Sequence, residues 1–257
     1  MKPLVVVAGA SSGIGRAAAL RFARDGATVI AIARTRAALE ALAAEQPGIE
    51  IDAVDASDAA AVDAFGARVL ATHGVPDVVV NSAGLGTWKY LEDTTGAEVV
   101  GMIGAPYLAA AHVTRVFVGA MVRRGSGVIL HVGSPASFQP WPGTPSYTAS
   151  RWALRGLHEA LRLDLTGTGV WSCHVVFGEV TSSYFTNNPD SHQHLPSIAS
   201  WIPRSTPEQC ADVLVATARS PRHEVLSPLM LRVFLWFQWL TPGIFRAIVQ
   251  RTGRRRP

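Results

Sequence analysis

The first residues of the sequence form an apolar run, a glycine-rich turn and a helical pattern in immediate succession. Residues 4–8 read Leu-Val-Val-Val-Ala, a run typical of a strand buried on both faces. Apolar residues recur at helical spacing over residues 14–22, so Gly9, Gly13 and Gly15 lie where the strand gives way to a helix N-terminus. Such a terminus attracts phosphate through its free N–H groups and its dipole. The arrangement predicts a dinucleotide-binding turn; a loop that is glycine-rich only for turning is the alternative.

Strand-like apolar runs alternate with helical stretches along the rest of the sequence. The expected strands cover residues 4–8, 28–33, 49–54, 77–81, 127–133, 170–177 and 223–227. With 257 residues and 48% hydrophobic content, the chain can bury one large core. We expect an α/β fold of the Rossmann type, a doubly wound seven-stranded parallel sheet in three α/β/α layers. Residues 1–228 would form a single NAD(P)-binding domain with a substrate lid at 183–205, and residues 229–257 an apolar helical extension with a basic tail.

The residues after the second expected strand indicate which dinucleotide is used. Residues 34–36 read Arg-Thr-Arg, where an NAD-binding protein usually presents a carboxylate to the ribose 2′-hydroxyl. A guanidinium can instead bind a 2′-phosphate in a bidentate way. The sequence therefore favours NADP(H) over NAD(H), with Arg34 as the phosphate ligand and Arg36 as a weaker helper. The alternative is that both arginines are solvated residues of the next helix.

Further motifs follow the glycine turn. Residues 81–84 read Asn-Ser-Ala-Gly after an apolar run, Ser134 precedes Tyr147 by thirteen residues, and Arg151 follows Tyr147 by four. Together with the turn, these motifs resemble the short-chain dehydrogenase/reductase family over residues 4–226. The resemblance implies a nicotinamide-dependent oxidoreductase in which Ser134, Tyr147 and Arg151 are the catalytic residues.

The same resemblance implies the contacts to the cofactor. Residues 54–55, Val-Asp, resemble the acidic position that contacts adenine, and residues 177–182 resemble the Pro-Gly-x-Val-x-Thr segment that borders the nicotinamide. In that segment Phe177 replaces the proline and Ser182 the threonine. The implied cofactor-binding residues are Gly9, Ser11, Ser12, Gly13, Ile14, Gly15, Arg34, Asp55, Asn81, Ala83, Gly84, Tyr147, Arg151, Gly178, Val180 and Ser182.

Spacing and charge suggest how the catalytic residues act. Tyr147 and Arg151 lie four residues apart, on one face of a helix, so the cation can stabilise the phenolate formed when Tyr147 exchanges a proton. Ser134 would donate to the substrate carbonyl, and the hydride would come from the cofactor. Two positions depart from the family pattern. Arg151 stands where the family has lysine, and it keeps the charge but cannot relay a proton. The family's helix-kinking asparagine corresponds to Pro106 or, with a gap, to Met102; a proline can keep the kink but its side chain cannot hold a water.

Two functions remain open at this point. In the first, the protein is an NADP(H)-dependent oxidoreductase that interconverts a lipophilic ketone or aldehyde and its alcohol, with Tyr147 as general acid and base. In the second, it is a catalytically impaired NADP(H)-binding relative that acts as a sensor or scaffold. Retention of Ser134 and Tyr147 behind an intact turn favours the first. Apolar surface in residues 135–143 and aromatic residues such as Trp88 favour a lipophilic substrate.

The C-terminal residues 229–249 are apolar and rich in tryptophan, with Arg232 and Arg246 among them. They pack over the pocket or a partner subunit, which we favour, or they form an interfacial membrane anchor. The family resemblance implies a homodimer or homotetramer that pairs through two long helices. Four residues would lie near that interface: His112, Arg115, Arg155 and His158.

Composition and isolated motifs indicate few other partners. The net charge of +4 is dispersed apart from a terminal run of arginines, so no nucleic-acid partner is expected. His192 and His194 have no third ligand nearby, and no metal is expected. Cys173 and Cys210 fit core thiols in a reducing compartment. The first expected strand leaves no room for a signal peptide, so we expect a cytoplasmic protein, membrane-associated at most.

Overall fold

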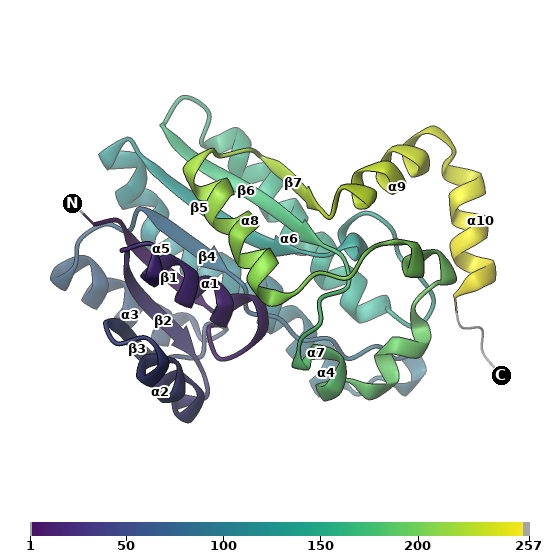
Figure 1. Ribbon diagram of the computed structural model, residues 1–257, viewed down its shortest axis with the longest axis horizontal. Helices are drawn as coiled ribbons and strands as arrows, with labels where there is room; N and C mark the ends of the chain where they lie inside the picture. The colour runs from purple at the N-terminus through teal and green to yellow at the C-terminus, as the bar shows by residue number, and fades with distance from the viewer. Residues whose placement is uncertain (1, 254–257) are drawn as a thin grey trace.

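The computed structural model describes residues 2–253. They form one parallel sheet between two layers of helices (Figure 1). The sheet has seven strands in the order β3-β2-β1-β4-β5-β6-β7, and every neighbouring pair is parallel. The predicted Rossmann-type fold is confirmed. The strands are β1 (Leu4–Ala8), β2 (Thr28–Ala33), β3 (Ile49–Ala53), β4 (Val78–Asn81), β5 (Gly127–Gly133), β6 (Val170–Phe177) and β7 (Glu224–Ser227).

Helices cover both faces of the sheet. One face packs against α1 (Gly13–Arg24), α2 (Arg36–Glu45) and α8 (Pro207–Arg219), and the other against α3 (Ala59–Thr72), α5 (Ala109–Arg124) and α6 (Pro145–Asp164). In β1, Val5 and Val7 point into the first core, whereas Val6 points into the second. All three are fully buried, which explains why the strand reads as a continuous apolar run rather than an alternating one.

A π-helical turn, Gly104–Leu108, joins α4 (Gly96–Ile103) to α5. Pro106 lies inside this turn, and because proline has no N–H to donate, the helix widens there instead of continuing its regular hydrogen bonds. The sequence predicted a kink at this residue. The combined helix, residues 96–124, is long and apolar enough to cross a membrane. Its residues Val113, Phe117 and Met121 are nevertheless fully buried against the sheet, as in the core helix of a globular domain.

Apart from α8, the helical segments that follow β6 lie beyond the carboxyl ends of the strands. After β6 come α7 (Ser183–Asn187), two short 3₁₀ turns and α8, and after β7 come α9 (Leu229–Leu240) and α10 (Pro242–Thr252). In Figure 1, α9 and α10 stand at one end of the molecule, outside the sheet. The basic tail, Arg254, Arg255 and Arg256, lies outside the described residues. Because the chain crosses over between β1 and β4, the carboxyl ends of these central strands leave a crevice for a ligand.

Candidate active site

One cavity of about 710 Å³ occupies this end of the sheet. Part of its lining comes from residues that end or follow the first five strands. These residues lie in the ranges 9–14, 32–34, 54–57, 82–88 and 132–135. It continues through α6, the segment after β6, and both C-terminal helices. The glycine turn and the helix that carries Tyr147 therefore face the same space, although more than a hundred residues separate them.

The glycine turn closes tightly against the end of β4. Gly9 has a φ of +83°, and a Cβ there would lie 2.5 Å from the backbone nitrogen of Ala83. A Cβ on Gly15 would lie 2.2 Å from the carbonyl oxygen of Gly9, so both positions require glycine. Ser12 is the N-cap of α1, but its side chain makes no capping hydrogen bond. The first N–H groups of α1 are therefore open for an anion in the cavity.

Arg34 and Asp55 line the cavity at the ends of β2 and β3. Two hydrogen bonds from Ser57, its hydroxyl at 2.6 Å and its backbone N–H at 2.9 Å, reach one oxygen of Asp55. The Ser57 hydroxyl is the main cause that lowers the pKa of Asp55, and the nearby charge of Arg34 adds to it. Within residues 2–253 Arg34 is exposed and forms no ion pair, so its guanidinium is available to a ligand. Arg36 does not line the cavity.

Ser134, Tyr147 and Arg151 all line the cavity and all are buried. Ser134 follows β5 directly, and its Oγ accepts a hydrogen bond from the N–H of Ala136 at 3.3 Å. Tyr147 and Arg151 lie one turn apart on α6, with the guanidinium carbon 5.0 Å from the centre of the phenol ring. Arg151 donates to the carbonyl oxygen of Val132 at 3.2 Å, whereas its Nε has no partner among the described residues. The structure thus places a buried cation beside a buried phenol.

Aromatic side chains enclose the phenol of Tyr147. Trp88 lies 5.4 Å from it between ring centres, and Trp141 lies 6.5 Å away. Tyr184, which sequence reasoning did not single out, also reaches this box: its hydroxyl accepts from Trp88 Nε1 at 3.1 Å. Burial raises the pKa of Tyr184 well above its usual range, and the adjoining hydroxyl of Tyr147 raises it further. The signal that could have found it is the aromatic pair, Tyr184 and Phe185, that closely follows Ser182.

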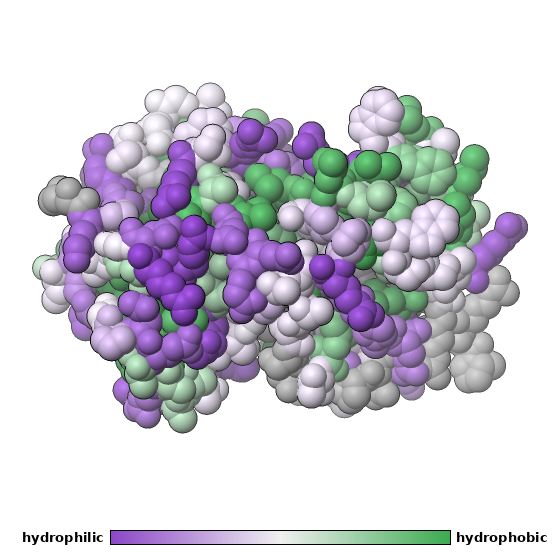
Figure 2. Space-filling model, in the orientation of Figure 1, coloured by the Kyte–Doolittle hydropathy of each residue, from purple (hydrophilic) through white to green (hydrophobic). Residues whose placement is uncertain are grey.

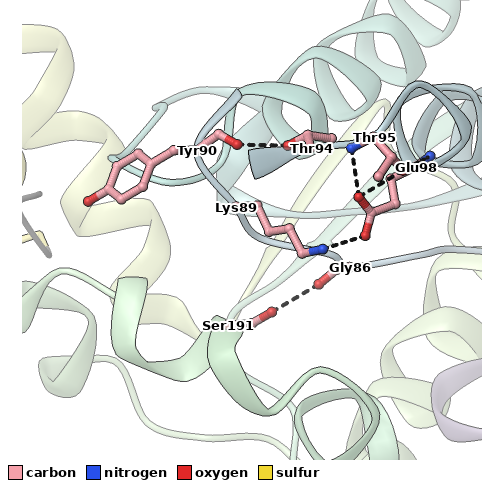
Figure 3. Close-up of polar contacts among 7 residues, drawn as sticks. All are labelled: Gly86, Lys89, Tyr90, Thr94, Thr95, Glu98 and Ser191. Atoms are coloured by element: carbon pink, nitrogen blue, oxygen red, sulfur yellow. Dashed lines mark hydrogen bonds and ion pairs between the residues drawn. The ribbon is translucent and has the colours of Figure 1, made fainter. Parts of the chain in front are cut away.

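The loop after β4 that carries Trp88 is fixed at both ends (Figure 3). Lys89 donates to Glu98 at 2.6 Å, and Glu98 closes a capping box with Thr95 at the start of α4. These contacts, led by the Lys89 hydrogen bond, lower the pKa of Glu98 to about 2. From the segment after β6, Ser191 donates to the carbonyl oxygen of Gly86 at 3.0 Å. The loop therefore ties the segment after β6 to the wall that holds Trp88.

Three expected residues lie away from the cavity lining. Asn81 is buried behind it, and its Nδ2 donates to Thr114 Oγ1 at 3.0 Å, so its side chain fixes α5 to β4 rather than facing a ligand. Gly15 acts through close packing beneath the turn, as described above. Phe138 lies under the guanidinium of Arg155, 4.1 Å from its carbon, and not in the apolar wall that the sequence predicted. The other expected cofactor residues line the cavity.

A family model described as short chain dehydrogenase matches residues 3–193. The chain belongs to the short-chain dehydrogenase family. The predicted resemblance is confirmed by this match. A dehydrogenase is an oxidoreductase, so the cavity that holds the buried phenol and the buried cation is the candidate active site of an oxidoreductase.

Relatives of this short-chain dehydrogenase cover parts of its length. Probable oxidoreductase EphD of Mycobacterium tuberculosis is 39% identical over 172 residues, which are 65% of this chain and 29% of the relative. The chain thus spans less than a third of that relative. A 3beta-hydroxysteroid dehydrogenase of Mediterraneibacter gnavus is 35% identical over 178 residues, 67% of this chain and 64% of the relative.

Solved structures share the whole fold of this short-chain dehydrogenase. A short-chain dehydrogenase from Streptomyces avermitilis has a TM-score of 0.83 and 26% identity, and the match covers 95% of this chain and 94% of that one. An alcohol dehydrogenase from Thermococcus sibiricus, complexed with 5-hydroxy-NADP, has a TM-score of 0.76 and 28% identity over 88% of this chain and 96% of that one.

Three buried histidines lie between the sheet and α6 of this short-chain dehydrogenase. His131 on β5 pairs in register with His174 on β6, and His158 on α6 stacks on His174 with ring centres 5.6 Å apart. None of the three is exposed to solvent. The ring of His158 cannot itself contact a partner subunit, because it is enclosed within the chain and contacts Ser172 Oγ at 2.9 Å.

The histidine cluster should make the folded state sensitive to acid. Burial lowers the pKa of His131 to about 3 and, together with nearby arginines, that of His158 to about 4. An unfolded histidine gains its proton near pH 6.5, so between these values the unfolded chain binds more protons than the folded one. Stability should fall as the pH falls from 7 to 5, by about 2 kcal/mol for each histidine.

Urea unfolding at a series of pH values measures this effect. His131→Asn should reduce the slope of the unfolding free energy against pH by roughly a third, whatever its effect on absolute stability. His73→Asn, which changes only a surface contact with Glu50, serves as the matched control. A wild-type unfolding free energy that stays flat between pH 7 and pH 5 would contradict the prediction.

Proposed function

We propose that this short-chain dehydrogenase uses NADP(H) to interconvert a lipophilic ketone or aldehyde and its alcohol. One observation carries the proposal. The same cavity contains the uncapped N-terminus of α1, the free guanidinium of Arg34, and the buried group of Ser134, Tyr147 and Arg151. Conversion of NADPH and a hydrophobic ketone into equal amounts of NADP⁺ and alcohol tests it.

The residues present fit a bound dinucleotide. The turn at Gly9 and the open N-terminus of α1 suit a pyrophosphate, and Arg34 suits a 2′-phosphate. The Nε of buried Arg151, which has no partner among the described residues, offers a hydrogen bond to the ribose beside Tyr147. The complex of a structural relative with 5-hydroxy-NADP supports the choice of cofactor. When bound, NADPH supplies the hydride that reduces a carbonyl carbon.

The chain's own residues then handle the charge that develops on the substrate oxygen. Ser134 donates its hydroxyl hydrogen to that oxygen and holds it in place. Tyr147 delivers a proton to the same oxygen, and in the oxidative direction it takes the proton back. Arg151 keeps a fixed positive charge against the phenol ring throughout, and the surrounding aromatic side chains exclude water.

A lipophilic substrate fits the outer part of the cavity. The charged side chains of the described lining are Arg34, Asp55, Arg151 and Glu179, and the first two lie at the adenine end. Glu179 is paired with Arg204 at 2.9 Å and is not available to a substrate cation. The apolar lining comprises Leu195, Pro196, Ile198, Ala199, Ile202, Leu231, Phe234, Leu235, Phe245 and Val249. The relative named 3beta-hydroxysteroid dehydrogenase supports a bulky alicyclic substrate of this kind.

Arg34 should set the preference for NADP(H). Arg34→Ala removes the guanidinium expected to bind the 2′-phosphate, so NADPH should bind about tenfold or more weakly while NADH binding changes little. Arg36→Ala is the matched control, because Arg36 lies two residues away and outside the cavity. Dissociation constants for both cofactors, measured from quenching of protein fluorescence, give the ratio. An unchanged ratio in Arg34→Ala would assign the preference to another residue.

The exposed faces of α5 and α6 bear on how the protein assembles. We propose a cytoplasmic homo-oligomer that pairs through α5 and α6. Trp152 and Leu163 on α6 and Val122 on α5 are exposed large apolar residues, which supports an interface there. An impaired relative that only binds the cofactor is not favoured, because the buried cation and phenol are kept together.

A further inference from the structure

Helix α9 presents apolar side chains on opposite faces. Its inner face, through Leu231, Phe234 and Leu235, lines the cavity. Its outer face is exposed, and Phe237 on this face makes a ring contact with Phe245 of α10 at 5.9 Å between ring centres. The exposed large apolar residues of α9 and the start of α10 are Leu229, Met230, Val233, Trp236, Phe237, Trp239, Leu240 and Ile244. Figure 2 shows hydrophobic side chains gathered at the end of the molecule that α9 and α10 form in Figure 1.

The charged side chains of α9, α10 and the residues after them are all positive. Glu224 is the last acidic residue of the sequence, and only arginines carry charge beyond it. Arg232, Arg246 and Arg251 are exposed on α9 and α10, and residues 254–256, outside the described residues, are three more arginines. The side chains of Trp236 and Trp239 are 67% and 75% exposed. Exposed tryptophan beside arginine is the composition of helices that lie in the headgroup region of an anionic bilayer.

We propose that the outer face of α9 and α10 docks on the surface of an anionic lipid bilayer, and that a lipophilic substrate passes from the bilayer to the cavity beside α9. The second part rests on the proposed function. A single helix separates the exposed face from the cavity, so docking places the apolar end of the cavity next to lipid. Gln238 holds this helix to the site by donating to the carbonyl oxygen of Phe138 at 3.1 Å.

Charge and length argue against other occupants of this face. A second copy that paired symmetrically through α9 and α10 would bring arginines against arginines, with no acidic residue in the segment to offset them. A helix of 12 residues is about 18 Å long, well short of the roughly 30 Å needed to cross a bilayer. An interfacial position satisfies both the apolar face and the cations.

Flotation of the full-length protein with lipid vesicles tests the docking. Vesicles of phosphatidylcholine and phosphatidylglycerol in equal parts should carry the protein at low salt, and vesicles of phosphatidylcholine alone should carry much less. The double variant Trp236→Ser with Trp239→Ser should bind the mixed vesicles about tenfold or more weakly, because it removes the two most exposed aromatic residues of α9. Trp171→Ser, at the opposite end of the sheet, is the matched control and should float like the wild type.

A second arm tests the substrate route with the same variants. The double variant should show a KM about tenfold or more higher for a hydrophobic ketone carried in mixed vesicles, with an unchanged KM for a water-soluble ketone. Equal KM changes for both ketones would overturn the route.

The outcomes separate docking from catalysis. Failure of the wild type to float, or flotation unaffected by the double variant, would overturn the docking. A wild-type dimer that the double variant dissociates would also overturn it, because a second copy would then cover the face. Flotation needs neither cofactor nor turnover. A protein that floats but turns over no carbonyl would therefore refute the proposed function and leave the docking intact.

Discussion

Replacement of Tyr147 by phenylalanine should lower kcat by roughly a thousandfold and leave NADPH binding nearly unchanged. Phenylalanine keeps the ring that packs against Trp88 and Trp141, so the aromatic box should survive. The variant loses only the hydroxyl that exchanges a proton with the substrate oxygen. Steady-state kinetics with NADPH and a hydrophobic ketone, beside fluorescence titration with NADPH, measure the two quantities separately.

Tyr184→Phe is the matched control for this substitution, because its hydroxyl adjoins that of Tyr147 in the same aromatic box. We expect it to lower kcat by no more than about tenfold, since Tyr184 supports the site without delivering the proton. If Tyr184→Phe were inactive and Tyr147→Phe active, the assignment of the acid and base would have to be exchanged between the two phenols.

Replacement of Arg151 by methionine should lower kcat by roughly a hundredfold and weaken NADPH binding. Methionine nearly matches the length of the arginine stem but carries no charge, so the phenol of Tyr147 loses the cation that lies 5.0 Å from its ring centre. The carbonyl oxygen of Val132 also loses its donor. Thermal unfolding of the variant, measured beside its kinetics, separates a loss of folding from a loss of catalysis.

Arg151→Lys is the informative comparison, because lysine restores a positive charge with a different donor geometry. We expect it to keep activity within about tenfold of the wild type. A methionine variant as active as the wild type would show that the cation plays no part. A lysine variant as impaired as the methionine one would show that the planar guanidinium, not its charge, is needed.

The sequence predicted the sheet closely because its five central strands are buried on both faces. The run of residues 78–80, three valines, is typical of a strand in a parallel sheet core, and all three side chains are buried. The turn at Gly9 could be predicted equally well from the order of strand, glycine and helix. In the structure, a positive φ and a close approach to Ala83 both require glycine at this position. The valine run and the succession of strand, glycine turn and helix are local patterns of the sequence.

Features that depend on pairing between distant segments could not be predicted in the same way. The buried histidines come from β5, β6 and α6, and their contact follows from a register in which His131 meets His174. Without that register, His158 looked like a surface residue of a long helix. Asn81 sits in an expected motif, but Thr114 on α5 decides which way its side chain turns.

The wall of the active site also depends on contacts between segments that are far apart in the sequence. Tyr184 meets Trp88 across 96 residues of sequence, and Ser191 meets Gly86 across 105. The segment after β6 must fold back over the loop after β4 before either contact exists. Motif spacing and the family resemblance therefore predicted Ser134, Tyr147 and Arg151 as catalytic candidates, whereas the aromatic box around them emerged only from the fold.

NADPH consumption by the purified full-length protein, with a set of hydrophobic ketones and aldehydes, most directly tests the claim that this site is a working oxidoreductase. The alcohol formed should be quantified in the same samples. We predict that at least one carbonyl gives equal losses of NADPH and gains of alcohol. NADPH that binds to the protein, with no alcohol from hydrophobic or water-soluble carbonyls, would contradict that claim.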